Sequence, residues 1–536
     1  MTCFLLRSKK STAQTLLALI ASGLLTLSAT AQSQNSGLQL PRPTTVVPDT
    51  IPQRTHLGQV EVGGLVSTTK ETPYWLHTNQ FGIFPKTAPT GLLIASIRSD
   101  YRYQNNNNRF KPDWGYGLEV VGQTGVAANR VILSEAFLKL RIGFIELSGG
   151  RRKEVIGLAQ SRLSSGSFIW SGNALPMPKV ELSIPEYLPL GFMRSWLALK
   201  GSFAHGWFGN GTYVQGSYLH QKALYFRVGK PHFRVRLYGV FTHQAQWAGY
   251  APFLERDPTS SFQGQLANSF EAYMNVVVPL KTDALKNLSK FTTYDQNRVG
   301  DHRGSAEAAL EIRLNHGSIL AYQQHFYDLG RKLYNLRNIE DGLYGLQYTS
   351  TRPHPLLAEA LVELFNSGNQ GVLQFGKSLG GEWENYFING QYPDGWSYQG
   401  RTLGTPFISQ TDDVNPSLPS IPVSSYTLDN QLISGKFGIN NNRIWALHAG
   451  AAGNISRQWG YVTKVTYSKN YGLFSTPFPP NTNQLSCLLS ITRTISKRTV
   501  STLIASIGYD KGTLLKQPQQ LGGYLAFRKT LPITHN

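Results

Sequence analysis

Apolar and polar residues alternate along most of this chain in stretches of about ten residues. From about Gly115 onward, these stretches are separated by clusters of Gly, Asn, Pro and Asp, which favour turns. A two-residue period is that of a β-strand, whose side chains point alternately to the two faces of a sheet. In residues 134–142, one face carries Ala136, Leu138, Leu140 and Ile142, and the other carries Glu135, Phe137, Lys139 and Arg141.

The same alternation returns in six further ranges: 233–241, 306–314, 461–467, 485–491, 500–508 and 521–527. One face is apolar and the other is charged, which predicts an all-β fold, an outer-membrane antiparallel β-barrel with lipid outside and a polar lumen inside. We count roughly sixteen to twenty strands. A secreted β-sandwich or propeller would alternate in the same way, but aromatic residues at strand ends favour the barrel. The candidate girdle residues are Trp196, Trp207, Tyr225, Phe241, Trp445, Trp459, Tyr467, Tyr509 and Phe527.

Two segments interrupt the strand pattern. Residues 355–367 place Leu357, Leu361, Leu364 and Phe365 at helical spacing after Pro355, which predicts an amphipathic helix inside or at the mouth of the barrel. The Pro-rich residues 153–190 are too long for a hairpin turn and predict a folded-in loop. Both would act as small helical and loop elements that plug the barrel.

The first residues have the pattern of an export signal. Three basic residues precede an apolar run at 16–27 and the small-residue sequence Ala29-Thr30-Ala31. We expect residues 1–31 to be a signal peptide, 32–56 an extended Pro-containing lead-in, and 57–536 the transmembrane barrel with its occluding loops and short helices. The expected location is the outer membrane of a Gram-negative bacterium, since no later run is long enough for a membrane-spanning helix.

The charge of the chain indicates what kind of partner it attracts. The formal net charge is +20, and loss of Arg7, Lys9 and Lys10 with the signal peptide lowers it to +17. In an exported protein this excess favours acidic polysaccharide, lipopolysaccharide phosphate or anionic lipid over nucleic acid. Cleavage would also remove Cys3 and leave only Cys487, so no internal disulfide is expected.

No sequence signature commits the chain to catalysis. It lacks HExxH, CxxC and GxSxG motifs and a Gly-rich phosphate loop that leads into a helix. Carboxylate pairs such as Glu382 with Glu384, or Asp412 with Asp413, could serve a glycosidase but are common in solvated loops. We therefore expect a protein that is not an enzyme and that uses neither a cofactor nor a metal ion.

Residues 385–408, NYFINGQYPDGWSYQGRTLGTPFI, are aromatic, amide-rich and punctuated by Gly. Flat aromatic faces beside hydrogen-bonding ends suit the stacking and orientation of sugar rings. The candidate polysaccharide-binding residues here are Asn385, Tyr386, Trp396, Tyr398 and Arg401. In a second interpretation, Trp396, Tyr398 and Arg401 hold the barrel interior together instead.

Two neighbouring segments add further candidates. GGRRKEVIG at 149–157 concentrates Arg151 and Arg152 between glycines, and Arg can grip carboxylate or phosphate groups with two hydrogen bonds. Residues 161–182 contribute Trp170 and Asn173. For any single charge, the competing interpretation is a lumenal ladder in which Arg pairs with Glu.

Together these segments resemble the Wzi family of outer-membrane capsule-assembly proteins. The resemblance rests on PYWLHTNQFG at 73–82, GRRKEVIG at 150–157, SGNALPMPK at 171–179, GLYGLQY at 342–348 and NYFINGQYPDGWSYQGRTLGTP at 385–406. It implies an eighteen-stranded outer-membrane barrel, closed by loops and small helices, that acts as a lectin and holds capsular polysaccharide at the cell surface. Polysaccharide export machinery and lipopolysaccharide would be further partners.

The leading functional hypothesis is therefore a barrel lectin that binds capsular or other surface polysaccharide and helps retain or assemble it. A porin or substrate-specific uptake channel would share the barrel, the aromatic girdle and the charged lumen. An outer-membrane enzyme that acts on lipid or glycan is the third alternative.

Overall fold

The computed structural model describes residues 56–102, 112–125, 129–279, 283–287, 289–296, 298–328, 336–374, 377–378, 383–496 and 500–533. The expected signal peptide and all but the last residue of the lead-in lie outside these residues, and His56 already belongs to the first strand. Glu382 also lies outside them.

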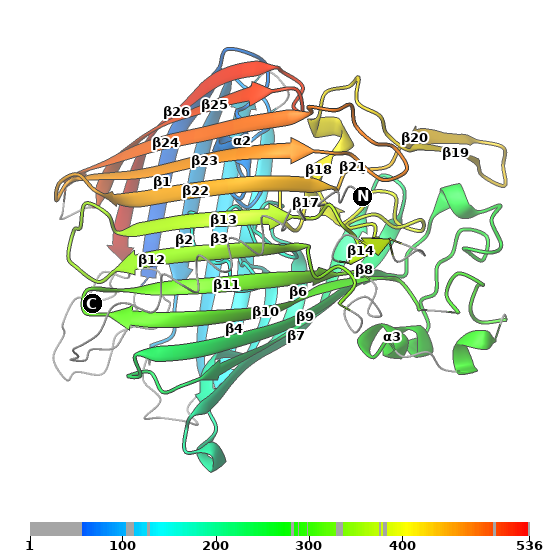
Figure 1. Cartoon of the computed structure of the whole chain (residues 1–536), viewed down its shortest axis with the longest axis horizontal. Coiled ribbons are helices and arrows are strands. Elements are labelled where there is room, and N and C mark those ends of the chain that lie inside the picture. The colour runs from blue at the N-terminus through cyan, green and yellow to red at the C-terminus, as the bar shows by residue number, and fades with distance from the viewer. Residues whose placement is uncertain are drawn as a thin grey trace, which may run out of the picture. The chain divides into compact units, whose positions relative to one another are not determined.

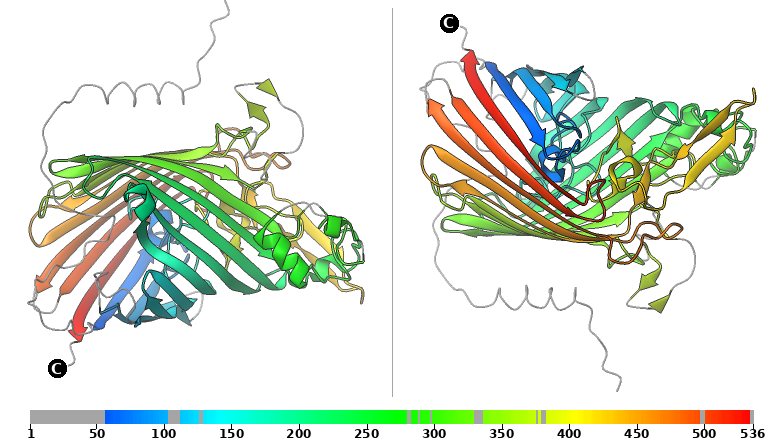
Figure 2. Two further views of the ribbon diagram at one scale, coloured as in Figure 1. Left: turned by 90° about the horizontal axis from the view of Figure 1, so that it is seen from below. Right: turned by 90° about the horizontal axis from the view of Figure 1, so that it is seen from above.

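Eighteen antiparallel strands form one closed barrel, as the alternation predicts (Figures 1 and 2). Each strand pairs with the next along the chain, except that β13 pairs with β22, and β26 closes the ring against β1. The strands are β1 (His56–Ser67), β2 (Thr90–Ser99), β3 (Asp113–Gly125), β4 (Arg130–Ile142), β5 (Ile145–Arg151), β6 (Pro178–Pro189), β7 (Leu197–Asn210), β8 (Gln215–Val228), β9 (Val235–Trp247), β10 (Asp301–Leu314), β11 (Gly317–Tyr327), β12 (Gly342–Ser350), β13 (Glu359–Asn366), β22 (Ile444–Asn454), β23 (Trp459–Asn470), β24 (Asn483–Ser496), β25 (Ser501–Gly512) and β26 (Gln519–Ile533).

The remaining elements are short and lie in the connections. They are the helices α2 (Tyr74–His77) and α3 (Phe270–Val277), the 3-10 turns η2 (Gly191–Met193), η3 (Pro252–Leu254), η4 (Asp283–Lys286) and η5 (Thr411–Asp413), and the strands β14 (Leu373–Gln374), β15 (Lys377–Ser378), β16 (Ser397–Tyr398), β17 (Arg401–Thr402), β18 (Ser409–Gln410), β19 (Pro422–Tyr426), β20 (Leu432–Lys436) and β21 (Ile439–Asn441). Among the helices of the described residues, none is long and apolar enough to cross a membrane.

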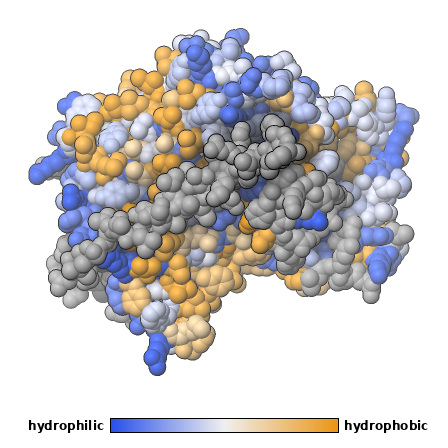
Figure 3. Space-filling model, in the orientation of Figure 1, coloured by the Kyte–Doolittle hydropathy of each residue, from blue (hydrophilic) through white to orange (hydrophobic). Residues whose placement is uncertain are grey.

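The outer wall is apolar and the inner wall is polar. On β4, Leu138 is 66% exposed, whereas its neighbour Lys139 points into the lumen and is buried. The same alternation places Leu237 outside and Arg236 inside on β9. Apolar side chains gather over the strands in the space-filling view (Figure 3). A closed sheet with this exterior satisfies its backbone hydrogen bonds and can face lipid hydrocarbon.

The shortest turns lie at one end of the barrel, and the longest connections lie at the other end. Two-residue turns join β4 to β5 and β10 to β11, whereas residues 152–177, 248–300 and 367–443 join strands at the opposite end. Outer-membrane barrels keep short turns on the periplasmic side and long loops on the cell exterior. We therefore assign the long connections to the exterior.

Three expectations need correction. Residues 359–366 form strand β13 instead of a helix, because Leu361, Glu363 and Phe365 alternate inward and pair with β12 and β22 on either side. The folded-in loop ends at residue 177, since strand β6 begins at Pro178. Tyr225 is not part of an outer girdle, because its side chain faces the lumen and is buried.

Candidate functional site

The lumen is filled by the chain itself. The connection 152–177 crosses it: Glu135 of β4 accepts a hydrogen bond from the Lys153 amide at 3.0 Å, and Glu363 of β13 accepts one from the Ser165 amide at 2.7 Å. β4 and β13 stand nine positions apart in the ring of eighteen, so they face each other across the barrel. This connection therefore spans the lumen from wall to wall.

The aromatic segment 385–408 packs against this crossing loop. Phe168 stacks on Phe326 of β11 at 3.8 Å between ring centroids and meets Tyr386 edge-on at 5.5 Å. The Trp396 indole N–H donates to the carbonyl of Ile169 at 2.9 Å. Side chains from both connections and from the inner wall form one continuous buried cluster. The segment is thus the core of a plug.

Buried polar groups also hold the plug in place. The Tyr386 hydroxyl donates to Asp341 at 2.9 Å and accepts from the Asn338 amide at 2.9 Å. Burial raises the pKa of the Asp341 carboxyl to about 7, and burial together with Asp341 raises that of the Tyr386 phenol. The guanidinium of Arg303 lies 5.0 Å from the centre of the Trp396 ring, within the range of a cation–π contact.

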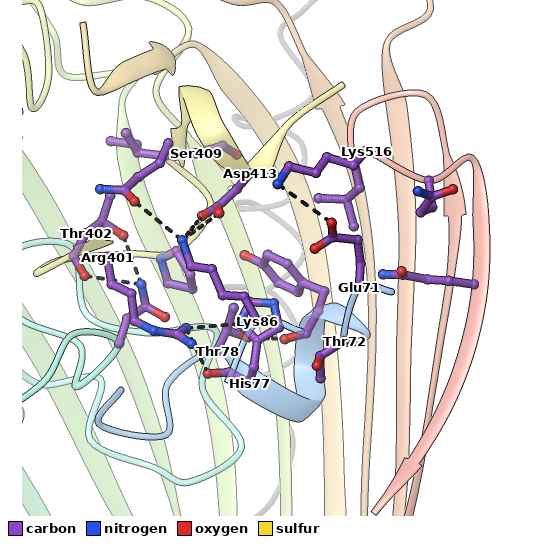
Figure 4. Close-up of a pocket in the computed structure, with 18 residues that line it drawn as sticks. Glu71, Thr72, His77, Thr78, Lys86, Arg401, Thr402, Ser409, Asp413 and Lys516 are labelled. Carbon is purple, nitrogen blue, oxygen red and sulfur yellow. Dashed lines mark hydrogen bonds and ion pairs between the residues drawn. The ribbon is translucent and has the colours of Figure 1, made fainter. Parts of the chain in front are cut away.

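A small polar cavity, the outer basin, lies where the plug meets the exterior end of the wall (Figure 4). Its volume is about 50 Å³. Four connections build it: residues 68–89 between β1 and β2, residues 513–518 between β25 and β26, the plug residues 401–413, and the crossing loop 152–177, which contributes Asn173. Its charged and titratable side chains are Glu71, Tyr74, His77, Lys86, Arg401, Asp413 and Lys516.

Hydrogen bonds hold most of these charges in place. Lys86 Nζ donates to both carboxylate oxygens of Asp413, at 2.5 and 2.7 Å, and to the Gly400 carbonyl at 2.8 Å. Arg401 donates to the Phe84 carbonyl at 2.6 Å and lies 3.0 Å from His77 Nδ1. Lys516 is held more loosely than Lys86 and Arg401, because its Nζ lies 3.7 Å from Glu71 Oε1.

Cations outnumber carboxylates in this enclosed space, and burial lowers the pKa of three of its basic groups. Burial lowers the pKa of Arg401 to about 10, although Asp413 opposes the shift. Burial, Arg401 and Lys86 lower the pKa of His77 well below its usual value, so the imidazole is neutral at pH 7. Burial also lowers the pKa of Lys86 in spite of Asp413. The basin can therefore accept an anionic or hydroxyl-rich group beside Lys516 and Lys86.

The structure places the nine candidate polysaccharide-binding residues in three settings. Arg401 and Asn173 line the outer basin. Arg152 and Trp170 line a second cavity of about 10 Å³, in which Arg152 pairs with Glu146 at 2.6 Å. The remaining five take part in plug contacts: Arg151 donates to the Tyr398 hydroxyl at 3.1 Å, Asn385 accepts from Asn442 at 2.9 Å, and Tyr386 and Trp396 are fully buried.

Burial changes what these residues can contact. Protein atoms cover the rings of Tyr386 and Trp396 completely, so neither ring offers a face to a polymer in this structure. The interpretation in which Trp396, Tyr398 and Arg401 hold the barrel interior together agrees with their contacts. A sugar contact by the other candidates stays a prediction.

Sequence reasoning missed Glu71, Lys86 and Lys516, which line the basin. Each is an ordinary charged residue in a connection between strands, and no local motif marks it. Asp413 was noted only as one half of a carboxylate pair, but its carboxylate is held by Lys86. Of the other pair members, Glu384 is buried in the plug and accepts from the Asp328 amide.

The fold and the filled lumen define the class: an outer-membrane-type β-barrel closed by its own exterior connections. No family model and no curated protein sequence matches the chain. Among solved structures, it is similar to Wzi of Escherichia coli, described as an outer membrane protein involved in group 1 capsule assembly and a carbohydrate-binding β-barrel. The TM-score is 0.51 at 13% identity, over 89% of this chain and 85% of that one.

Two other solved barrels share less of the geometry. OccAB2 of Acinetobacter baumannii gives a TM-score of 0.42 at 9% identity, over 90% of this chain and 98% of that one. OmpF of Salmonella typhi, in complex with daunomycin, gives 0.38 at 7% identity, over 90% and 99%. The likeness to Wzi establishes the barrel fold at this level of identity, and membership of the Wzi family stays a prediction.

Proposed function

We propose that this protein is a non-catalytic outer-membrane lectin that binds capsular or other surface polysaccharide and helps to retain or assemble it on a Gram-negative cell. The observation that carries the proposal is the outer basin, a cation-rich polar cavity at the exterior end of a barrel whose lumen is filled. A filled lumen suits a binding protein better than an open channel, because a diffusing solute needs a continuous water-filled path.

The ligand chemistry follows from the charges of the basin. Lys516 is exposed, and the side chains of Lys86 and Asp413 are 28% and 29% exposed, so both signs of charge are within reach of solvent. A sugar hydroxyl can donate to the carboxylate, while an acidic substituent on the polymer pairs with the ammonium groups. Many weak contacts along one polymer would add up by multivalency.

Binding of purified surface polysaccharide to the protein in detergent or vesicles tests the proposal. We expect Lys516→Gln to weaken binding and to reduce its dependence on salt, because the variant loses one accessible cation. Lys290→Gln is the matched control. Lys290 also lies in an exterior connection, but in the one between β9 and β10, on the far side of the ring from β25 and β26.

Equal loss of binding in both variants would point to non-specific charge attraction and contradict the proposed site. No binding by the unchanged protein, together with normal polysaccharide retention in cells that lack it, would overturn the function. A large, steady current through the unchanged protein in a planar bilayer would favour the channel instead.

A further inference from the structure

Helix α3 lies against the outside of the barrel wall. Its inward side chains Ala272 and Val276 pack with Ala245 and Trp247 of β9. Trp247 shares a strand face with Leu237 and Phe241, which are 50% and 40% exposed on the outer wall, because these residues are separated by even numbers of positions. Figures 1 and 2 place α3 beside the strands, at the end where the long connections gather.

The helix covers polar groups that would otherwise face outward. On β8, the outward positions change from the exposed Leu224 to Lys222 and His220, and on β9 from Phe241 to His243. Lys222 Nζ donates to the carbonyl of Val277, the last residue of α3, at 2.5 Å. An uncovered Lys on the lipid face destabilises a barrel, most strongly at the bilayer midplane and less near the interface. The helix therefore removes a polar patch from the outer wall.

The height of α3 can be judged from two exposed Trp residues near the ends of β7. Trp196 immediately precedes the strand at the short-turn end and is 51% exposed, and Trp207, eleven positions further along, is on the outward face of the strand and is 41% exposed. At about 3.3 Å per residue and a tilt near 40°, they are separated by roughly 28 Å along the barrel axis, which is about the height of an outer-membrane apolar band. Trp207 therefore marks the outer girdle. His205 contacts both Trp207, at 5.2 Å between ring centroids, and Tyr273 of α3, at 5.9 Å.

The opposite side of α3 carries an exposed apolar stripe. Phe270, Met274 and the following residue Val278 are spaced four apart, on one face of the helix, and are 76%, 47% and 49% exposed. Ser269 caps the helix by accepting from the Ala272 amide at 3.1 Å, so its start is well defined. The helix thus replaces a polar patch on the wall with an apolar surface, at the height where the lipid begins.

We propose that α3 is an interfacial helix whose stripe of Phe270, Met274 and Val278 lies among the acyl chains of the outer leaflet. We choose acyl chains as the partner of the stripe because the stripe continues the apolar outer surface of the wall. That surface runs from Leu224 and Phe241 past the covered histidines and Lys222 to the helix. A short amphipathic helix with large apolar side chains on one face suits the boundary between headgroups and acyl chains. The inference concerns membrane seating and does not depend on polysaccharide binding.

Spin-label accessibility tests this inference in the full-length barrel. Cys3 and Cys487 are replaced by Ser, and one nitroxide is attached at Met274→Cys after reconstitution into vesicles of phosphatidylcholine and phosphatidylglycerol. Two matched labels supply the references. Leu489→Cys, on the outer wall, is the lipid reference, and its side chain is 45% exposed. Leu428→Cys, between β19 and β20, is the solvent reference, and its side chain is 51% exposed.

We expect the label at position 274 to be relaxed more by oxygen than by a water-soluble nickel chelate, as at position 489 and in contrast to position 428. A nickel response like that at position 428 would place the stripe in water and overturn the proposal. Protection from both reagents would indicate a protein cover, and spin–spin broadening would indicate a second copy of the chain; either result would also overturn it. Heat-modifiable gel mobility confirms that each labelled barrel is folded.

Discussion

Glu363 on the inner wall is the main polar anchor of the loop that crosses the lumen. Its carboxylate is 1% exposed and accepts from Ser164 Oγ at 2.7 Å and from the Ser165 amide and hydroxyl at 2.7 and 2.5 Å. The Tyr322 hydroxyl donates to the same group. Glu363→Ala removes all of these acceptors at once and leaves their donors buried.

The magnitude follows from these contacts. A hydrogen bond to a charged group contributes about 1.5–3 kcal/mol, and loss of one partner of a buried charge network costs about 3–5 kcal/mol in total. We expect Glu363→Ala to favour opening of the loop by about 4 kcal/mol, which is roughly a thousandfold in the open population at about 1.4 kcal/mol per factor of ten. Glu363→Gln keeps one acceptor oxygen, so its open population should lie between those of the unchanged protein and Glu363→Ala.

Single-channel recording in a planar bilayer measures how often the crossing loop opens the lumen. The unchanged protein should be closed almost all of the time, and Glu363→Ala should show frequent open events. Glu186→Ala is the control, because Glu186 pairs with Arg141 near the short-turn end of the barrel and its side chain is 60% exposed. If Glu363→Ala opened no more often than Glu186→Ala, the reasoning that Glu363 holds the plug would be refuted.

Three further outcomes are expected. Because burial and neighbouring cations lower the pKa of His77, its contribution to stability is full above the ordinary His pKa of about 6.5 and is lost as the pH falls below it. The protection factors for hydrogen exchange over residues 74–87, which are corrected for the pH dependence of the intrinsic exchange rate, should therefore fall between pH 7 and 5, and fall less in His77→Gln. Gly404→Ala should loosen the plug but not the barrel, since a Cβ would lie 1.9 Å from the Phe168 carbonyl oxygen; protease cleavage within 385–410 at unchanged barrel melting temperature would show this. Trp396→Ala should destabilise the plug by about 3–5 kcal/mol, as expected for a buried Trp, and unchanged protease resistance would contradict it.

The alternation of apolar and polar residues was enough to predict the strands, and aromatic residues at the strand ends favoured a barrel over a sandwich or propeller. Alternation on segments such as 134–142 and 306–314 depends only on which face of a strand each residue occupies, and those faces are the outer and inner sides of the barrel wall. The same local reasoning failed at residues 359–366. There Leu361, Leu364 and Phe365 fit a helical spacing as well as a strand, and only pairing with β12 and β22 decides between the two.

The role of the aromatic segment 385–408 was beyond local reasoning. Tyr386 and Trp396 have the chemistry of a sugar-binding surface, but the loop 152–177 and the inner wall cover them. The outer basin was equally out of reach, because Glu71, Lys86 and Lys516 come together only when the first and last strands of the ring pair. The sequence determined the strands and the two faces of the wall, since a two-residue period is a local property of the backbone. Tertiary structure decided which side chains fill the lumen and which remain open to a ligand, since burial depends on contacts between residues far apart in the chain.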